Sequence, residues 1–160
     1  MAKRPTALIL ESMYHRAGEE LLARHLDIQF LRDPTPAAIA GAIRPVAAVF
    51  VRYPCRLHGE AIRAAKELVV ISTSGRGTDA IDIAAATERG IAVVNNPGLG
   101  SVPVSEHTVG FMLDLAKQVS ESNADVRQGK GWGEGYKSTR IHLEGRTLGV
   151  IGCEIGRAHV

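Results

Sequence analysis

A chain of 160 residues is long enough to bury one substantial hydrophobic core. Its 45% hydrophobic and 22% charged residues are typical of a globular protein, and its net charge of +2, without basic runs, disfavours nucleic-acid binding. Aromatic residues make up only 4%, which also disfavours a base-stacking surface. Cys55 and Cys153 are too few for a disulfide framework, so we expect reduced thiols and a cytoplasmic protein. The apolar run from Ala7 to Leu10 is too short for a signal or membrane segment.

Short apolar runs alternate with helical patterns over the first hundred residues. Continuous apolar runs are typical of parallel strands covered on both faces, and they predict strands at Thr6–Leu10, Ile28–Leu31, Ala47–Val51, Leu68–Ile71 and Ile91–Val94. Helices are predicted between them, at Ala17–Leu26, Pro36–Ile43, His58–Lys66 and Asp82–Gly90. Thr35 and Asp82 are predicted N-caps, and Gly90 a left-handed helix stop. The alternation predicts right-handed crossovers and therefore a doubly wound α/β sheet.

The pattern changes after Asn95-Asn96-Pro97-Gly98, which interrupts the chain. A long helix is predicted to begin at Ser105 to Thr108, within about 104–119, and its apolar segment Val109–Ala116 should be buried on most sides. A polar, glycine-rich connection at 129–140 leads to a predicted strand, Thr147–Ile151, which ends at Gly152. A strand that runs into glycine is typical of a dinucleotide-binding turn. We therefore expect a domain boundary between Pro97 and Val104.

Three motifs follow one another within the central stretch of the chain. They are G-R-G-x-D-x-I-D from Gly75, A-A-x-x-R-G-I-x-V-x-N-x-P-G from Ala85, and V-x-E-H-T from Val104. This order resembles the NAD-dependent D-2-hydroxyacid dehydrogenases, the phosphoglycerate, glyoxylate and hydroxypyruvate reductase group, and the likeness extends to Gly152. The resemblance implies an N-terminal fragment of a two-domain oxidoreductase. Residues 1–100 would be a flavodoxin-like substrate domain, and residues 101–153 the first helix and strand of a Rossmann domain.

The resemblance also implies an activity for the intact protein. A hydride would pass between NAD or NADP and a D-2-hydroxy acid or 2-oxo acid, in an enzyme that forms a homodimer. The residue that selects NAD over NADP, and the catalytic arginine, glutamate and histidine, are expected beyond residue 160. We therefore expect the chain alone to be inactive and to lack affinity for NAD.

Ligands of open parallel sheets bind beyond the carboxyl ends of the strands, where two candidate substrate sites lie. Arg52 and Tyr53 follow the third strand, where a guanidinium could bind a carboxylate or phosphate, although a solvated loop arginine is equally compatible. The fourth strand is followed by Ser74, Gly75, Arg76 and Gly77. The glycines could let backbone N–H groups form an anion nest, and a plain turn is the alternative. The resemblance implies that this loop holds the substrate carboxylate and that Arg76 also approaches the cofactor.

The candidate cofactor residues are Arg76, Thr108 and Gly152, all three implied by the resemblance. His107, beside Glu106, invites a catalytic interpretation, but a packing role is the better hypothesis. The histidines and cysteines show no HExxH or CxxC-type spacing, so we predict no metal site.

The end of the sequence departs from the family pattern. After Gly152 a G-x-G-x-I-G turn is expected, whereas the chain has Gly152-Cys153-Glu154-Ile155-Gly156, with the second glycine absent. Residues 154–160 can be back-translated into a string that contains a common sequencing-adapter sequence. We interpret them as a non-native tail, and the alternative is a genuine variant of the glycine loop.

Two other functional hypotheses stay open at this point. One is a flavodoxin-like binding module without enzymatic activity, and the other is a relative that binds NAD without turnover. A phosphoacceptor module would need acidic residues after its first and third strands. Glu11 follows the first strand, but Arg52 follows the third, which disfavours that version.

Overall fold

The computed structural model describes residues 4–13, 15–130 and 140–152. The contacts of the chain divide it into two compact units, residues 1–97 and residues 98–160. No described helix is long and apolar enough to cross a membrane.

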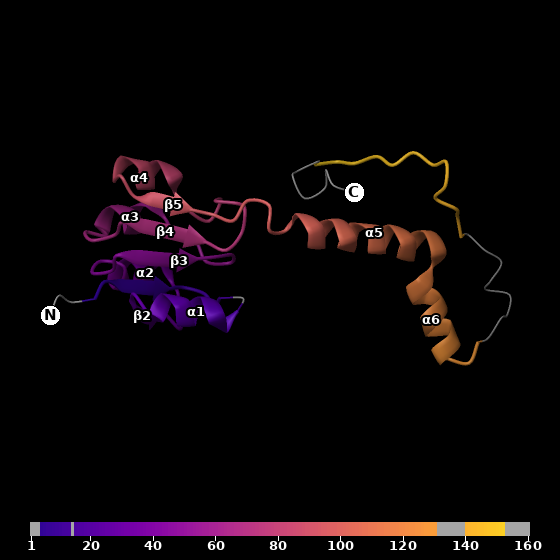
Figure 1. Cartoon of the computed structure of the whole chain (residues 1–160), viewed down its shortest axis with the longest axis horizontal. Coiled ribbons are helices and arrows are strands. Elements are labelled where there is room, and N and C mark those ends of the chain that lie inside the picture. Colours follow the sequence, from indigo (N-terminus) through magenta and orange to yellow (C-terminus); the bar gives the residue numbers. More distant parts are fainter. Residues whose placement is uncertain (1–3, 14, 131–139, 153–160) are drawn as a thin grey trace. The chain divides into compact units, whose positions relative to one another are not determined.

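Unit 1 is a parallel sheet whose strands alternate with helices (Figure 1). Its described elements are β1 (Thr6–Ile9), α1 (Arg16–Ala23), β2 (Asp27–Phe30), α2 (Pro36–Ala42), β3 (Ala48–Val51), α3 (Gly59–Ala64), β4 (Val70–Thr73), α4 (Ile83–Glu88) and β5 (Ala92–Val94). The five strands are all parallel and lie in the order β2-β1-β3-β4-β5. This is the flavodoxin-like order, so the predicted doubly wound α/β sheet is confirmed.

The core of unit 1 lies between the sheet and helices α2, α3 and α4. Alternate residues of a strand point to the same face, and those on this face join the buried side chains of the helices in one cluster. Its fully or nearly fully buried members include Leu8, Val49, Ile71, Ile39, Ile43 and Ile62. Burying each such side chain stabilises the fold by about 1.5–3 kcal/mol. The well-packed sheet therefore fixes the positions from which the loops at its carboxyl edge begin.

Local signals in the sequence set the helix ends correctly. Thr35 Oγ1 accepts a hydrogen bond from the Ala38 N–H at 3.3 Å, and Asp82 Oδ1 accepts one from the Ala85 N–H at 2.9 Å. Gly90 has a φ of 66°, the left-handed conformation predicted for it. The strand β4 lies two residues later than predicted, because its ladder begins where Val70 pairs with Ala48.

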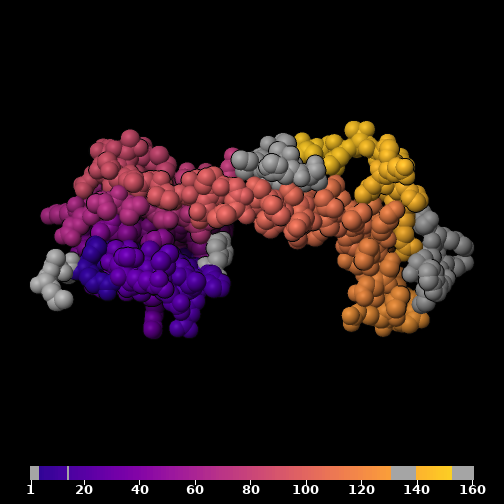
Figure 2. All heavy atoms as spheres, viewed as in Figure 1, coloured from indigo at the N-terminus to yellow at the C-terminus, as the bar shows by residue number. Residues whose placement is uncertain are grey.

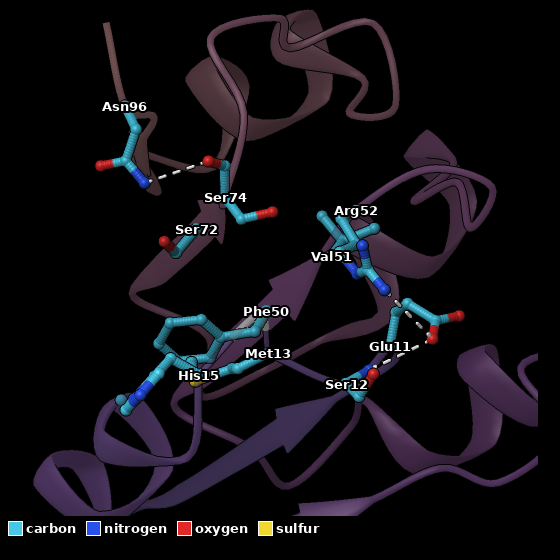
Figure 3. Close-up of a pocket in the computed structure, with 11 residues that line it drawn as sticks. Glu11, Ser12, Met13, His15, Phe50, Val51, Arg52, Ser72, Ser74 and Asn96 are labelled. Atoms are coloured by element: carbon cyan, nitrogen blue, oxygen red, sulfur yellow. Dashed lines mark hydrogen bonds and ion pairs between the residues drawn. The ribbon is translucent and has the colours of Figure 1, made fainter. Parts of the chain in front are cut away.

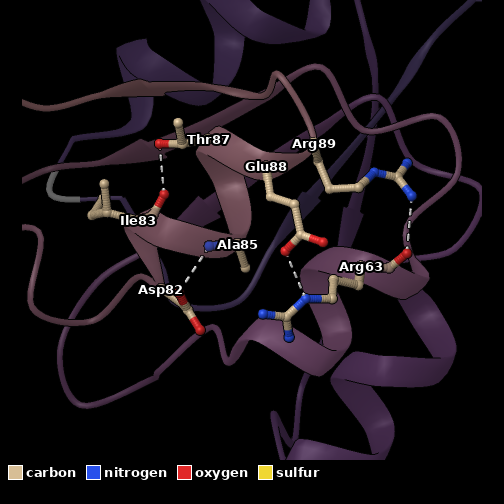
Figure 4. A network of polar contacts seen from close by, with 7 residues as sticks. All are labelled: Arg63, Asp82, Ile83, Ala85, Thr87, Glu88 and Arg89. Carbon is tan, nitrogen blue, oxygen red and sulfur yellow. Dashed lines mark hydrogen bonds and ion pairs between the residues drawn. The ribbon is translucent and has the colours of Figure 1, made fainter.

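Helices α3 and α4 are joined by a polar network (Figure 4). Arg63 Nε lies 3.0 Å from Glu88 Oε2, and the Arg89 guanidinium donates to the carbonyls of Arg63 and Ala65, both at 3.0 Å. Gly59 begins α3 and is buried close to the Asp82 carboxylate that caps α4. These contacts fix the two helices behind the loop that precedes α4.

Unit 2 contains α5 (Ser101–Lys117) and α6 (Val119–Arg127) among its described residues. The helix α5 begins four residues before the predicted start at Ser105. Gln118 then takes a left-handed φ of 54° and separates the two helices. The Asp114 carboxylate crosses this junction, because it accepts hydrogen bonds from the Ser120 N–H and the Ser120 hydroxyl, both at 2.7 Å.

Two apolar segments of unit 2 differ, in the described chain, from what their patterns alone predict. The segment Val109–Ala116 is not buried on most sides: Phe111 is 57% exposed and Leu115 is 80% exposed, and α5 lies at the surface in Figure 2. The segment Thr147–Ile151 forms no strand, because no other described segment of unit 2 is a strand that could pair with it. The chain that leads to this segment contacts α5 at Ile141, whose N–H donates to the Ala116 carbonyl at 3.0 Å.

Candidate functional site

The sheet reverses its strand order between β1 and β3, and the loops that leave β1, β3 and β4 meet near this point. Open parallel sheets bind ligands beyond the carboxyl ends of the strands at such a reversal. Two cavities lie at this edge, of about 410 Å³ and about 260 Å³. Arg52 and Ser74 line both of them.

The larger cavity gathers most of the predicted substrate residues. The described residues that line it are Arg52, Tyr53, Arg56, Thr73, Ser74, Gly75, Gly77, Asp79 and Ala80. The structure thus brings the exit of β3 and the loop after β4 to one place. Arg76 is exposed and is not among the lining residues.

Arg56 is a second cation at this cavity that the sequence did not single out. The Cys55 N–H donates to the Arg52 carbonyl at 2.9 Å, which closes a turn directly after β3. The turn brings Arg56 to the same cavity as Arg52. The sequence signal that could have identified Arg56 is its spacing from Arg52, four residues away across Pro54. Two guanidinium groups favour an anionic ligand, while the Asp79 carboxylate at the cavity opposes one.

The Ser74–Gly77 loop offers hydrogen-bond donors. The Ser74 Oγ is buried and makes no hydrogen bond to any described residue. Within the described chain, the backbone N–H groups of Gly75 and Gly77 also make none. Neither glycine has a positive φ, so the loop lacks the left-handed glycine of an alternating nest. Gly77 instead allows the Asp79 carboxylate to approach the loop closely, because a Cβ at residue 77 would lie 3.0 Å from Asp79 Oδ2.

The smaller cavity contains an ion pair at the strand reversal (Figure 3). Arg52 Nη2 lies 3.7 Å from Glu11 Oε1, and both side chains are about one-third exposed. Solvent screens such a pair, so it contributes at most about 1 kcal/mol. The sequence identifies Glu11 only as a phosphoacceptor candidate, because the spacing of Glu11 and Arg52 in the chain gives no sign of their ion pair.

Cys55 is a free, buried thiol beside this pair. Burial raises its pKa, the Glu11 carboxylate raises it further, and the Arg52 guanidinium opposes both effects. The Cys55 Sγ donates to the Leu10 carbonyl at 3.6 Å. The raised pKa keeps Cys55 in the protonated form that makes this contact.

The predicted cofactor residues in unit 2 lie on α5 and near the end of the described chain. The Thr108 hydroxyl donates to the Val104 carbonyl at 2.7 Å, one turn earlier in the helix. The His107 ring packs edge-on against Phe111, with 4.1 Å between ring centroids, as a packing role requires. Gly152 has a φ of 71°. Residues 154–160, the predicted non-native tail, lie outside the described residues. The described residues contain no group of three His, Cys, Asp or Glu side chains able to hold a metal ion.

Comparisons with known proteins give one consistent family. The family model for the catalytic domain of D-isomer specific 2-hydroxyacid dehydrogenases matches residues 7–149. The D-3-phosphoglycerate dehydrogenase of Archaeoglobus fulgidus is 34% identical over 145 residues, which make up 91% of this chain and 27% of that protein.

Solved structures of similar proteins agree with this match. A 2-hydroxyacid dehydrogenase from Ketogulonicigenium vulgare Y25 has a TM-score of 0.81 at 29% identity, over 99% of this chain and 51% of that one. An NADPH-dependent glyoxylate/hydroxypyruvate reductase from Sinorhizobium meliloti, in complex with NADP and malonate, has a TM-score of 0.81 at 25% identity, over 98% of this chain and 50% of that one. The chain therefore spans about a quarter of the curated relative and about half of the solved chains.

Proposed function

Because the chain belongs to the D-isomer specific 2-hydroxyacid dehydrogenase family, we propose that it supplies the substrate-binding part of an oxidoreductase. The reaction is hydride transfer between NAD or NADP and a D-2-hydroxy acid or 2-oxo acid. Residues 1–100 act as the substrate domain, and residues from 101 onward begin the NAD-binding domain. The division of the chain after Pro97 supports this assignment.

One observation carries the proposal: an anion-binding set of groups lines the larger cavity at the carboxyl edge of the sheet. Arg52 and Arg56 contribute positive charge, and Ser74 contributes a buried hydroxyl without a partner in the described chain. A buried, unsatisfied hydroxyl has a cost that a bound ligand would remove. A 2-oxo acid offers a carboxylate for these groups and a carbonyl that stays available for reaction.

In this assignment each predicted residue has a task. The N–H groups of Gly75 and Gly77 donate to the substrate carboxylate, while Arg52 and Tyr53 contact the far end of the substrate. NAD or NADP supplies or accepts the hydride. Arg76, Thr108 and Gly152 contact the cofactor, and the left-handed Gly152 supports this, since tight dinucleotide-binding turns use glycine.

The same proposal extends to assembly and location. The exposed apolar side chains of α5, among them Phe111 and Leu115, support a homodimer of the intact enzyme. The free thiol of Cys55 supports a reducing, cytoplasmic setting.

The test is a turnover assay on the whole protein that carries this chain. Glyoxylate and hydroxypyruvate are offered with NADH or NADPH, D-3-phosphoglycerate is offered with NAD or NADP, and absorbance of the reduced cofactor is followed. Turnover with one of these acids is the expected result. Saturable cofactor binding without turnover would instead favour the sensing hypothesis, and neither binding nor turnover would favour a non-enzymatic module.

A further inference from the structure

Two adjacent asparagines after β5 hold three consecutive carbonyl groups of the loop after β4. The Asn96 N–H donates to the Gly75 carbonyl at 3.0 Å, and Asn96 Nδ2 donates to the Ser74 carbonyl at 3.2 Å (Figure 3). Asn95 Nδ2 donates to the Arg76 carbonyl at 2.7 Å. We name this set of three hydrogen bonds the asparagine clasp.

We propose that Asn95 and Asn96 are positioning residues that fix the Ser74–Gly77 loop in the form that binds the substrate carboxylate. A carbonyl oxygen carries partial negative charge and repels a carboxylate, whereas N–H and O–H groups attract it. The clasp engages the carbonyls of the loop. The Gly75 and Gly77 N–H groups and the Ser74 hydroxyl make no hydrogen bond to a described residue, so they are available as donors. The anion in this inference rests on the proposed function, while the clasp rests on the contacts above.

The composition of the loop explains why it needs an external hold. Two of its four residues are glycines, which lose more backbone freedom on ordering than any other residue. Gly75, Arg76 and Gly77 are exposed, so packing contributes little to their order. Hydrogen bonds from outside the loop are then its main restraint, and the clasp supplies three of them.

The asparagine clasp lies at the boundary of unit 1. Asn95 and Asn96 directly precede Pro97, the last residue of unit 1. Gly98 follows with a φ of 90°, a conformation that favours glycine. The residues that hold the Ser74–Gly77 loop are therefore also the residues through which the chain leaves unit 1.

The first experiment tests the clasp without any ligand. Nitrogen-15 relaxation is measured for the Gly75 and Gly77 amides in the parent chain and in the Asn95→Leu/Asn96→Leu double variant, because leucine keeps the size of asparagine but has no amide. We expect order parameters near 0.85 in the parent and below about 0.6 in the double variant. Unchanged order in the variant, or mobile glycines in the parent, would overturn the proposal.

Two further variants control this measurement. Asn123→Leu replaces an asparagine on the exposed α6, where Asn123 Oδ1 accepts from Arg127 Nε, and it should leave the loop unchanged. The single variant Asn95→Leu keeps both hydrogen bonds of Asn96, so it should have intermediate order. It also provides a less disruptive test if the double variant unfolds.

The second experiment links the clasp to anion binding. The parent and the double variant are titrated with glyoxylate at constant ionic strength, and the amide shifts of Gly75 and Gly77 are followed. Loss of two side-chain hydrogen bonds should weaken binding by about 20-fold. Equal affinity in parent and variant would overturn the role of the clasp in binding. No shift in the parent would instead overturn the proposed function, while the relaxation result would still decide whether the clasp orders the loop.

Discussion

The substitution Gly59→Ala tests how closely α3 and α4 are packed behind the loop that precedes α4. A Cβ at residue 59 would collide with the Asp82 carboxylate and would lie 2.9 Å from Arg63 Nη1 and 3.2 Å from the Ala85 Cβ. These neighbours are held in place, because Asp82 caps α4 through the Ala85 N–H at 2.9 Å and Arg63 pairs with Glu88 at 3.0 Å (Figure 4). The added methyl group can be accommodated only if the cap or the helix moves.

The expected cost follows from two opposing effects. Overpacking a filled site costs about 1–3 kcal/mol, and displacing an N-cap costs about 1 kcal/mol more. The higher helix propensity of alanine returns up to about 1 kcal/mol. The net loss in the free energy of unfolding is then about 1–3 kcal/mol, which lowers the Tm of a unit of this size by roughly 5–20 °C.

A second helical glycine provides the matched control. Gly41 lies in α2 with a negative φ, and a Cβ there would have nothing within 4 Å. Gly41→Ala should therefore raise the stability by about 0.5–1 kcal/mol. Thermal unfolding followed by circular dichroism compares both variants with the parent. A Tm for Gly59→Ala at or above that of the parent would refute the close approach of the two helices.

Three other predictions concern the site and the α5–α6 junction. Gly77→Val should raise the KM for a 2-oxo acid about fivefold or more, because the new side chain would crowd Asp79 beside the Ser74–Gly77 loop; unchanged steady-state kinetics would count against this loop as the carboxylate site. Glu11→Gln removes the charge that pairs with Arg52 and should lower the KM for an anionic substrate about two- to fivefold, whereas a raised KM would show that the pair orients the arginine for binding. Hydrogen bonds from Ser120 lower the pKa of Asp114, so Ser120→Ala should move that pKa back toward its ordinary value in an NMR titration. Because the folded-state pKa is lowered, the contact stabilises the fold above the unfolded-state pKa of Asp114 and is lost as the pH falls through the folded-state pKa; an unshifted titration in the variant would contradict the assignment.

The features that sequence predicted well are those with local causes. The Asp82 side chain caps α4 with a backbone N–H three residues away, and Gly90 takes its left-handed φ at the end of the same helix. The parallel sheet followed from apolar runs that need cover on both faces. The ends of β4 were less predictable, because pairing with β3, rather than the apolar run from Leu68, sets where the ladder begins.

The candidate site was predictable only in part, because several of its contacts join distant residues. Arg52 and the Ser74–Gly77 loop follow strands, so the rule for open sheets located them. The hydrogen bond between Asn96 and Ser74 spans 22 residues, and it depends on β5 lying next to β4. Arg56 reaches the cavity through a turn after β3. Neither relation leaves a periodic signal in the sequence.

Unit 2 shows a different limit of sequence patterns. An apolar pattern states that a face favours burial, but it does not identify the surface that buries it. Leu115 on α5 is 80% exposed and Ile151 is 93% exposed; the first belongs to a segment whose pattern favours burial, and the second to a segment predicted to be a strand. The helix α5 forms nevertheless, because the backbone N–H and C=O groups in the interior of a helix pair with one another. The segment Thr147–Ile151 stays irregular, because a strand obtains its hydrogen bonds from a neighbouring strand. The two differences thus have one physical origin: both concern contacts with a partner surface, and only the helix can form its secondary structure without one.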